Sequence, residues 1–131
     1  MCIRDSFIRK GFEEKEFRML TNGLEEREFL YAEDCCEALE KIMCNYEEFN
    51  SSDDLHITSF KSTTILEIAS IIESLFRKEG LSVNIKPGVE QDQVQRSKKN
   101  RPNQYITKWW SPRTSIHEGI RYVFDYMKSN Y

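Results

Sequence analysis

The hydrophobic positions of this chain follow two different periods. In four segments apolar residues recur every three or four positions, which is typical of helices with one buried face. We predict helices over residues 7–14, over 32–47, from about 63 to a cap at Gly80, and from 115 onward. The last two begin with the spacing of a capping box, Thr64 with Glu67 and Ser115 with Glu118.

Four shorter segments favour strands: residues 16–20, 28–31, 55–59 and 81–85. Turn signals stand at Asn22-Gly23 and Pro87-Gly88. Because the strands do not alternate strictly with long crossover helices, a complete doubly wound sheet is not expected. The sequence predicts an α/β fold of the mixed α+β kind, arranged as one small lobe.

The composition allows one globular domain and narrows its partners. The chain has 131 residues, of which 39% are hydrophobic and 31% are charged, as is usual for folded domains. A net charge of -3 argues against nucleic-acid binding, which usually needs a basic excess. No apolar run approaches the ~20 residues of a membrane span, so no membrane partner is expected. A cluster of Lys and Arg over residues 96–113 nevertheless suggests a local anion site.

The cysteines form neither a disulfide framework nor a metal-binding pattern. Cys35, Cys36 and Cys44 share one predicted helix with apolar residues. Their spacing does not fit a zinc site, so no metal is expected. A chain without a disulfide framework suits a reducing compartment, and we expect a cytoplasmic protein.

Three motifs follow one another in an order that resembles a known family. They are Arg27-Glu28-Phe29-Leu30-Tyr31-Ala32-Glu33-Asp34, then Thr64-Ile65-Leu66-Glu67-Ile68-Ala69, then Trp110-Ser111-Pro112-Arg113-Thr114-Ser115-Ile116-His117-Glu118-Gly119-Ile120. Over roughly residues 7–128 the order resembles the C-terminal half of extended short-chain dehydrogenases. These form the NAD-dependent epimerase/dehydratase family acting on nucleotide sugars. Two positions depart from its pattern: Asn22-Gly23 stands for Gly-Asp-Gly, and Trp109 replaces a glycine.

The resemblance implies the C-terminal substrate-binding subdomain of a two-lobed enzyme whose Rossmann lobe holds NAD or NADP. Two features of that other lobe are absent from this sequence. No two of the five glycines lie within seven residues, whereas a dinucleotide-binding turn needs closely spaced glycines. No Tyr is followed four positions later by the Lys that the family pairs with it. We therefore expect a fragment with no catalytic residue and no bound cofactor, and hence inactive alone. Residues 7–131 form the expected subdomain, and residues 1–6 are expected to be a foreign or truncated leader.

Four residues are candidates for binding the substrate: Arg27, Tyr31, Lys86 and Arg96. In the resembled family the Arg that opens the first motif contacts the diphosphate, and a guanidinium can bind two phosphate oxygens at once. The alternatives are pairing of Arg27 with a neighbouring Glu, core packing of Tyr31, and solvated loop charges at Lys86 and Arg96. Asp34 is expected to cap its helix or to place Arg27. Trp110 is expected to pack under the last helix.

The sequence therefore predicts a fragment of an NAD(P)-dependent nucleotide-sugar epimerase or dehydratase. It would bind the nucleoside-diphosphate sugar and lack the hydride-transfer chemistry. An NADPH-dependent reductase is the alternative within the same family, and a non-catalytic binding module is the alternative outside the enzymes. The complete protein is expected to be a homodimer.

Overall fold

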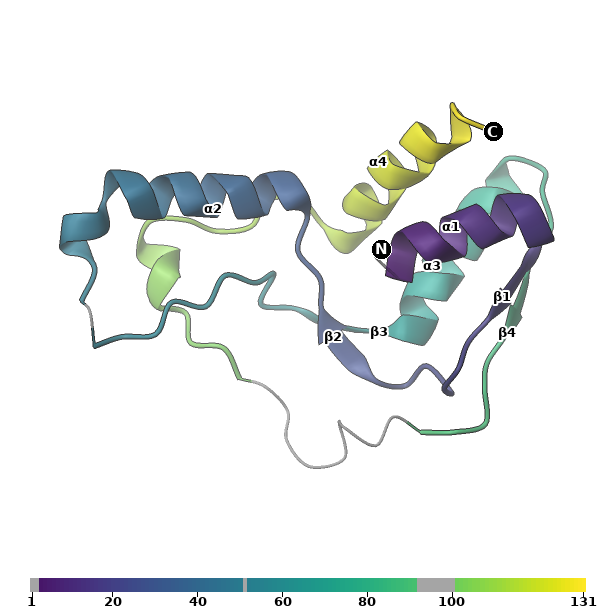
Figure 1. The fold of residues 1–131 in the computed structure, drawn as a ribbon, viewed down its shortest axis with the longest axis horizontal. Helices are drawn as coiled ribbons and strands as arrows, with labels where there is room; N and C mark the ends of the chain where they lie inside the picture. The colour runs from purple at the N-terminus through teal and green to yellow at the C-terminus, as the bar shows by residue number, and fades with distance from the viewer. Residues whose placement is uncertain (1–2, 51, 92–100) are drawn as a thin grey trace.

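The computed structural model describes residues 3–50, 52–91 and 101–131, and it has the predicted mixed α/β architecture (Figure 1). In chain order its elements are α1 (Ile3–Glu14), β1 (Glu16–Arg18), β2 (Glu26–Glu28), α2 (Ala32–Cys44), the 3₁₀ helix η1 (Tyr46–Glu48), β3 (Ser62–Thr64), α3 (Ile65–Lys78), β4 (Asn84–Lys86), the 3₁₀ helix η3 (Tyr105–Lys108) and α4 (Ile116–Lys128). α1, α3 and α4 gather at one end with β1 and β4, whereas α2 lies at the other end with η3 (Figure 1).

Both predicted capping boxes are present. In α3 the N–H of Glu67 donates to Oγ1 of Thr64 (3.1 Å), and the N–H of Thr64 donates to the Glu67 carboxylate (2.7 Å). Ser115 and Glu118 repeat this arrangement at the start of α4. The side-chain and backbone hydrogen bonds from Ser115 lower the pKa of Glu118, because they stabilise the ionised carboxylate.

The described strands pair in two short sheets. β1 and β4 are parallel, with Phe17 opposite Ile85. β2 and β3 are antiparallel, with Arg27 opposite Thr63. Each pair joins segments that are distant in sequence, so each sheet forms only when tertiary folding brings its two strands together.

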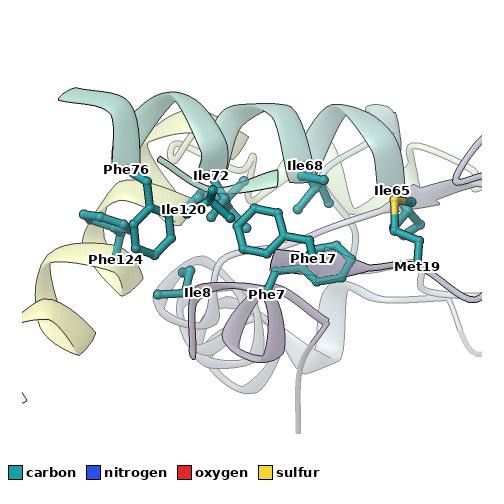
Figure 2. Close-up of a cluster of buried hydrophobic side chains, with 12 residues drawn as sticks. Phe7, Ile8, Phe17, Met19, Ile65, Ile68, Ile72, Phe76, Ile120 and Phe124 are labelled. Carbon is teal, nitrogen blue, oxygen red and sulfur yellow. The ribbon is translucent and has the colours of Figure 1, made fainter. Parts of the chain in front are cut away.

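The main core lies between α1, α3, α4 and β1 (Figure 2). On α3 the fully buried side chains Ile68, Ile72 and Phe76 share one face. The ring of Phe76 meets Phe124 of α4 edge-on, with centroids 4.9 Å apart. An added Cβ at Gly11 of α1 would lie 2.3 Å from the Phe76 ring, so the missing side chain lets α1 pack closely on α3.

A second cluster of apolar side chains lies under α2. Its buried members are Ala38, Ile106 and Trp110, and the residues packed against them are Leu30, Ile42, Leu55, Ile57 and Phe60. Trp110 is thus buried, but it packs under α2 and not under the last helix as expected. The reason is that η3 and Trp110 lie under α2, and the chain reaches α4 only through the residues that follow, 111–115 (Figure 1).

Several predicted limits differ from the structure. Residues 55–59 do not form a strand; Leu55 and Ile57 pack under α2, and the strand that pairs with β2 is Ser62–Thr64. Alternating apolar and polar residues indicate a segment with one buried and one exposed side, but a strand also needs a neighbouring strand to which it can hydrogen-bond. The strand expected at 28–31 lies at Glu26–Glu28, and α1 begins at Ile3, so residues 3–6 of the expected leader are part of that helix.

Candidate functional site

Two loops leave the carboxyl ends of the parallel strands β1 and β4 and run side by side (Figure 1). We call residues 19–25 and 87–91 the paired loops. Two backbone hydrogen bonds of 2.8 Å join them, from the N–H of Gly88 to the carbonyl of Thr21 and from the N–H of Asn22 to the carbonyl of Glu90. Because ligands of α/β proteins commonly bind outside the carboxyl ends of parallel strands, the paired loops are the candidate functional site.

Glycine at position 88 permits this close approach. An added Cβ there would lie 2.4 Å from the carbonyl oxygen of Leu20. The paired loops also hold three apolar side chains in solvent, and the two most exposed are Leu20 (94%) and Val89 (99%). Apolar side chains gathered on a surface are more informative than single ones and mark binding sites. Neither was a candidate from the sequence, since Leu20 ends a predicted strand and Val89 stands in a polar stretch.

The first of the paired loops is held by its own side chains and by α3. Oγ1 of Thr21 donates to the Glu25 carboxylate (2.6 Å) and accepts from the N–H of Gly23 (3.3 Å). Gly23 has a φ of 75°, in the left-handed region that favours glycine. The carbonyls of Gly23 and Glu25 accept from the N–H groups of Leu66 and Ile65 (2.9 and 3.3 Å). The first turn of α3 is therefore engaged by this loop.

Arg27 follows the same loop on β2. Its side chain is half-buried, and its Nη1 donates to the carbonyl of Glu26 (3.1 Å). The next residue, Glu28, accepts a hydrogen bond from the Thr58 hydroxyl. Oε2 of Glu25 is buried and has no hydrogen-bond partner within the described ranges. Buried carboxylate oxygens normally accept a hydrogen bond, from water or a ligand where no protein donor is near. A free hydrogen-bond acceptor therefore lies two residues before Arg27.

Lys86 ends β4, immediately before the second of the paired loops. Its Nζ lies 2.5 Å from one carboxylate oxygen of Glu16, whose other oxygen contacts Arg18. Hydrogen bonds from Arg18 and Lys86 hold the pKa of the Glu16 carboxyl below its usual value. The Lys86 side chain is still 58% exposed, so Glu16 positions an ammonium group that solvent can reach.

Tyr31 and Asp34 connect the start of α2 to the start of α4. An added Cβ at Gly119 would lie 3.3 Å from Cδ2 of Tyr31, and the Tyr31 ring centroid is 5.7 Å from that of Tyr122. Asp34 is 3% exposed, and its Oδ2 accepts from the N–H of Thr114 (2.9 Å). The expected cap at Asp34 is wrong, because α2 has no side-chain cap and this carboxylate binds a residue that only folding brings near.

The predicted site residues thus rest on different parts of the fold. Arg27 belongs to the β2–β3 sheet and Lys86 to the β1–β4 sheet, and the first of the paired loops connects β1 to β2. Tyr31 packs toward α4. Arg96 lies outside the described residues. The structure adds Leu20, Val89 and Glu25 to the candidates, none of which has a local sequence signal.

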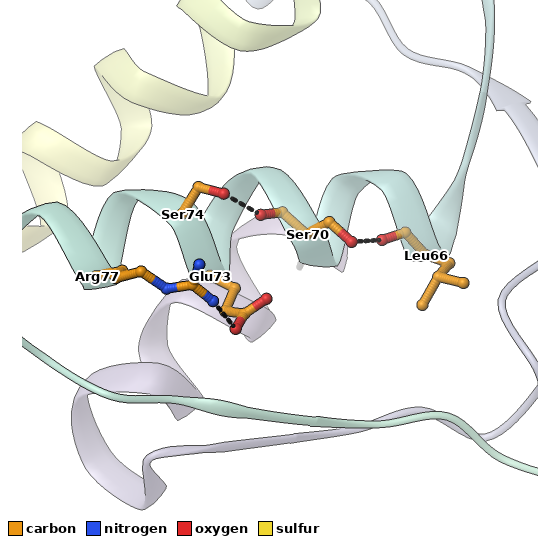
Figure 3. A network of polar contacts seen from close by, with 5 residues as sticks. All are labelled: Leu66, Ser70, Glu73, Ser74 and Arg77. Atoms are coloured by element: carbon orange, nitrogen blue, oxygen red, sulfur yellow. Dashed lines mark hydrogen bonds and ion pairs between the residues drawn. The ribbon is translucent and has the colours of Figure 1, made fainter.

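A groove of about 380 Å³ lies between α3 and α4. The hydroxyls of Ser70 and Ser74, which line it, donate to the carbonyls of Leu66 and Ser70 on α3 (2.9 Å each; Figure 3). Nearby on the same helix Arg77 pairs with Glu73 at 2.7 Å (Figure 3). Because these hydroxyls already donate to carbonyls of α3, the groove is a weaker candidate for a binding site than the paired loops.

Within the residues that the structure describes, no group of three or more His, Cys, Asp or Glu side chains is arranged to hold a metal ion. Over the same ranges, no helix is both long enough and apolar enough to cross a membrane. Cys35 is half-buried, and Cys36 and Cys44 are exposed thiols on α2.

Known proteins match this fold closely. The epimerase Mth375 from Methanothermobacter thermautotrophicus matches 99% of this chain and 38% of its own, with a TM-score of 0.81 at 15% identity. MoeE5 in complex with UDP-glucuronic acid and NAD matches 99% of this chain and 42% of its own, with a TM-score of 0.74 at 18% identity. For the UDP-glucuronic acid 4-epimerase of Bacillus cereus the shares are 99% and 40%, with a TM-score of 0.67 at 19% identity. No curated protein matches the chain at a significant level.

The chain therefore spans about 40% of the length of the solved structures that it matches. At these identities the structures establish the fold. In sequence, residues 4–58 match the family model described as "NAD dependent epimerase/dehydratase family". These residues contain β1, the first of the paired loops, Arg27 and α2. Over these residues the chain is similar to the NAD-dependent epimerase/dehydratase family, and over nearly its full length it has the fold of solved epimerase structures.

Proposed function

We propose that the chain is the substrate-binding part of an NAD(P)-dependent epimerase or dehydratase, and that it binds a nucleoside-diphosphate sugar across the paired loops and β2. The observation that carries the proposal is the combination of two cations, Arg27 on β2 and Lys86 at the end of β4, with exposed apolar side chains on the paired loops. Lys86 and Arg27 supply cations for a diphosphate. Leu20 and Val89 supply apolar surface for the flat face of a base.

The two cations are suited to different tasks. The guanidinium of Arg27 is planar and can bind two phosphate oxygens at once, whereas the ammonium of Lys86 acts as a point charge. Because they come from separate sheets, they can approach a diphosphate from two sides and neutralise its charge. Arg96 is a further candidate for this role. Tyr31 is proposed to act through its ring, which fixes the end of the β2 segment against Gly119.

The chemistry is proposed to belong to a dinucleotide-binding lobe outside this chain. MoeE5, whose fold the chain shares, was solved with UDP-glucuronic acid and NAD. We propose the same division of labour: the other lobe holds NAD or NADP, while residues 7–131 hold the substrate and orient its sugar. Fixing a substrate through its remote parts contributes to rate by setting the geometry of the reacting atoms. The isolated chain is then expected to bind nucleoside diphosphates and to catalyse nothing.

Calorimetric titration of the purified chain with UDP, GDP and dTDP tests the proposal. Arg27→Ala is expected to weaken diphosphate binding by about tenfold or more, because charge-assisted hydrogen bonds contribute roughly 1.5–3 kcal/mol. Arg77→Ala is the matched control, since Arg77 is an exposed arginine that pairs with Glu73 on α3. Equal affinities of the unchanged chain and Arg27→Ala would reject the assignment.

A further inference from the structure

The groove between α3 and α4 has an apolar floor and polar walls. Ile71 and Leu75 lie one turn apart on α3; both are half-buried and pack against the main core, whereas the other lining residues are exposed. Those exposed residues are Ser70, Ser74 and Lys78 of α3 and His117, Glu118 and Arg121 of α4. The groove shares no residue with the paired loops, so it is a separate site.

Two cations, one from each helix, are available to a ligand in the groove. Among the described residues, Lys78 has no ion-pair partner. Nε of Arg121 lies 3.7 Å from Oδ2 of Asp125, and the two side chains are 70% and 58% exposed. An ion pair that is so exposed contributes little to stability. The remaining guanidinium nitrogens of Arg121 can therefore donate to a bound anion.

The other polar groups of the groove are already engaged within their own helices. Oε2 of Glu118 accepts from the N–H and the hydroxyl of Ser115 (2.9 and 2.6 Å). A negative charge is favoured there, at the amino end of α4. Ser70 and Ser74 each have a single O–H donor, which a carbonyl of α3 accepts (Figure 3). Recognition of a ligand by charge therefore depends on Lys78 and Arg121, which attract an anion.

The size of the groove decides what kind of anion it suits. Its volume of about 380 Å³ lies in the range of small-molecule sites, roughly 300–1,000 Å³. An inorganic anion would leave Ile71 and Leu75 in contact with water. A peptide helix would need apolar anchors over about two turns, and this floor has only two apolar side chains. We propose that the groove binds a small organic anion whose aromatic or branched aliphatic body covers Ile71 and Leu75, and whose phosphate or carboxylate group is held by Lys78 and Arg121.

Amide chemical shifts of the full chain, followed by NMR, test the proposal with two probes, phenyl phosphate and phenylacetate. Both have an aromatic body, and they differ in the anionic group. At least one of them is expected to shift the amides of Ile71, Leu75, Lys78 and Arg121, and the tighter of the two identifies the preferred group. Inorganic phosphate and the neutral benzyl alcohol are each expected to bind at least tenfold more weakly, because each makes only one of the two kinds of contact.

Four outcomes of these titrations would overturn the proposal. No shift of the groove amides with either probe would show that nothing of this class binds. Equal binding of inorganic phosphate would indicate an adventitious ion only, and equal binding of benzyl alcohol would indicate apolar contact without recognition of charge. Shifts confined to residues 19–25 and 87–91 would place the probe at the paired loops.

Variants of exposed residues assign the binding to the groove. Lys78→Gln with Arg121→Gln is expected to weaken the tighter probe at least tenfold. Arg77→Gln is the matched control, because Arg77 is exposed, precedes Lys78 and pairs with Glu73 without lining the groove (Figure 3). Ser74→Leu is a second test, since its larger side chain would occupy the groove. Unchanged affinity in both the double variant and Ser74→Leu rejects the site.

The fold and the substrate site are checked separately. Because Lys78, Arg121 and Ser74 are exposed, these substitutions are expected to leave the midpoint of thermal unfolding within a few degrees. Arg27→Ala is expected to leave the affinity for the tighter probe unchanged. A loss of binding in Arg27→Ala would assign the anion to the proposed substrate site and overturn the inference. Failure of the groove leaves Arg27-dependent binding of UDP intact, so the two proposals can be rejected independently.

Discussion

At the scale of single residues, contacts between distant parts of the chain decide what each polar or small side chain does. Glu16 lies at the start of β1, yet its carboxylate is shared between Arg18 and Lys86, so it positions a cation at the edge of the candidate site. Asp34 reaches the loop before α4. Gly88 has the most local effect, because its missing side chain allows the paired loops to touch.

Gly88→Ala is expected to lower the free energy of unfolding by about 1–3 kcal/mol, as overpacking commonly does. The added methyl group would overlap the carbonyl of Leu20 and push the paired loops apart. Urea unfolding followed by circular dichroism measures the change. Val89→Ala is the neighbouring control, and its 99% exposed side chain should contribute less than about 0.5 kcal/mol. An unchanged midpoint for Gly88→Ala would contradict this account of the loop contact.

At the scale of elements, the helices and the strands are specified differently. α3 combines a capping box, a buried apolar stripe and a glycine after its last turn, and all three signals lie within the helix or next to it. β1 and β2 have only three residues each, and their partners lie far along the chain. The helices can therefore be located from local sequence, whereas the strands are defined by their neighbours.

Thr64→Ala is expected to destabilise the protein by about 1 kcal/mol, because the N–H of Glu67 loses its acceptor at the first turn of α3. Ser74→Ala in the same helix is the matched control. Its hydroxyl only donates to the carbonyl of Ser70, and alanine favours the helix, so no loss of stability is expected. Thermal unfolding of the two variants checks this; equal losses would show that the cap has no special role.

At the scale of the whole molecule, two apolar clusters of unequal size hold the fold. The larger one lies between α1, α3 and α4, and the smaller one joins α2 to η3 and to residues 55–60 (Figure 1). α2 also leaves Leu39 and Met43 exposed to water. The end of the molecule that contains α2 is therefore expected to open more easily than the other end.

Hydrogen exchange measured by mass spectrometry can test this difference. Amides of α3 around Ile68 and Ile72 are expected to exchange at least tenfold more slowly than those of α2 around Leu39 and Met43. The reason is that local opening requires less apolar surface to be exposed where fewer side chains are buried. Equal protection of the two helices in the isolated chain would contradict it.

Some of this organisation was open to prediction from sequence because its signals are local. The periods of apolar residues located α1, α2, α3 and α4, and Thr64 and Ser115 marked two helix starts through contacts three residues away. The order of the motifs, from Arg27–Asp34 to Trp110–Ile120, predicted the resemblance to the family whose model matches residues 4–58. Leu20, Val89 and the Asp34–Thr114 contact could not be predicted, because exposure and distant hydrogen bonds have no local pattern.

By itself, the sequence determined the helices, the resemblance to the epimerase/dehydratase family and the cations that are candidates for a diphosphate, since propensity, capping and motif spacing act over a few residues. Only the tertiary structure decided which strands pair, that residues 55–59 pack under α2 and do not form a strand, and that Leu39 and Met43 of α2 remain exposed. The physical reason is that pairing and burial depend on what lies beside a segment in space, and segments far apart in the chain provide those neighbours.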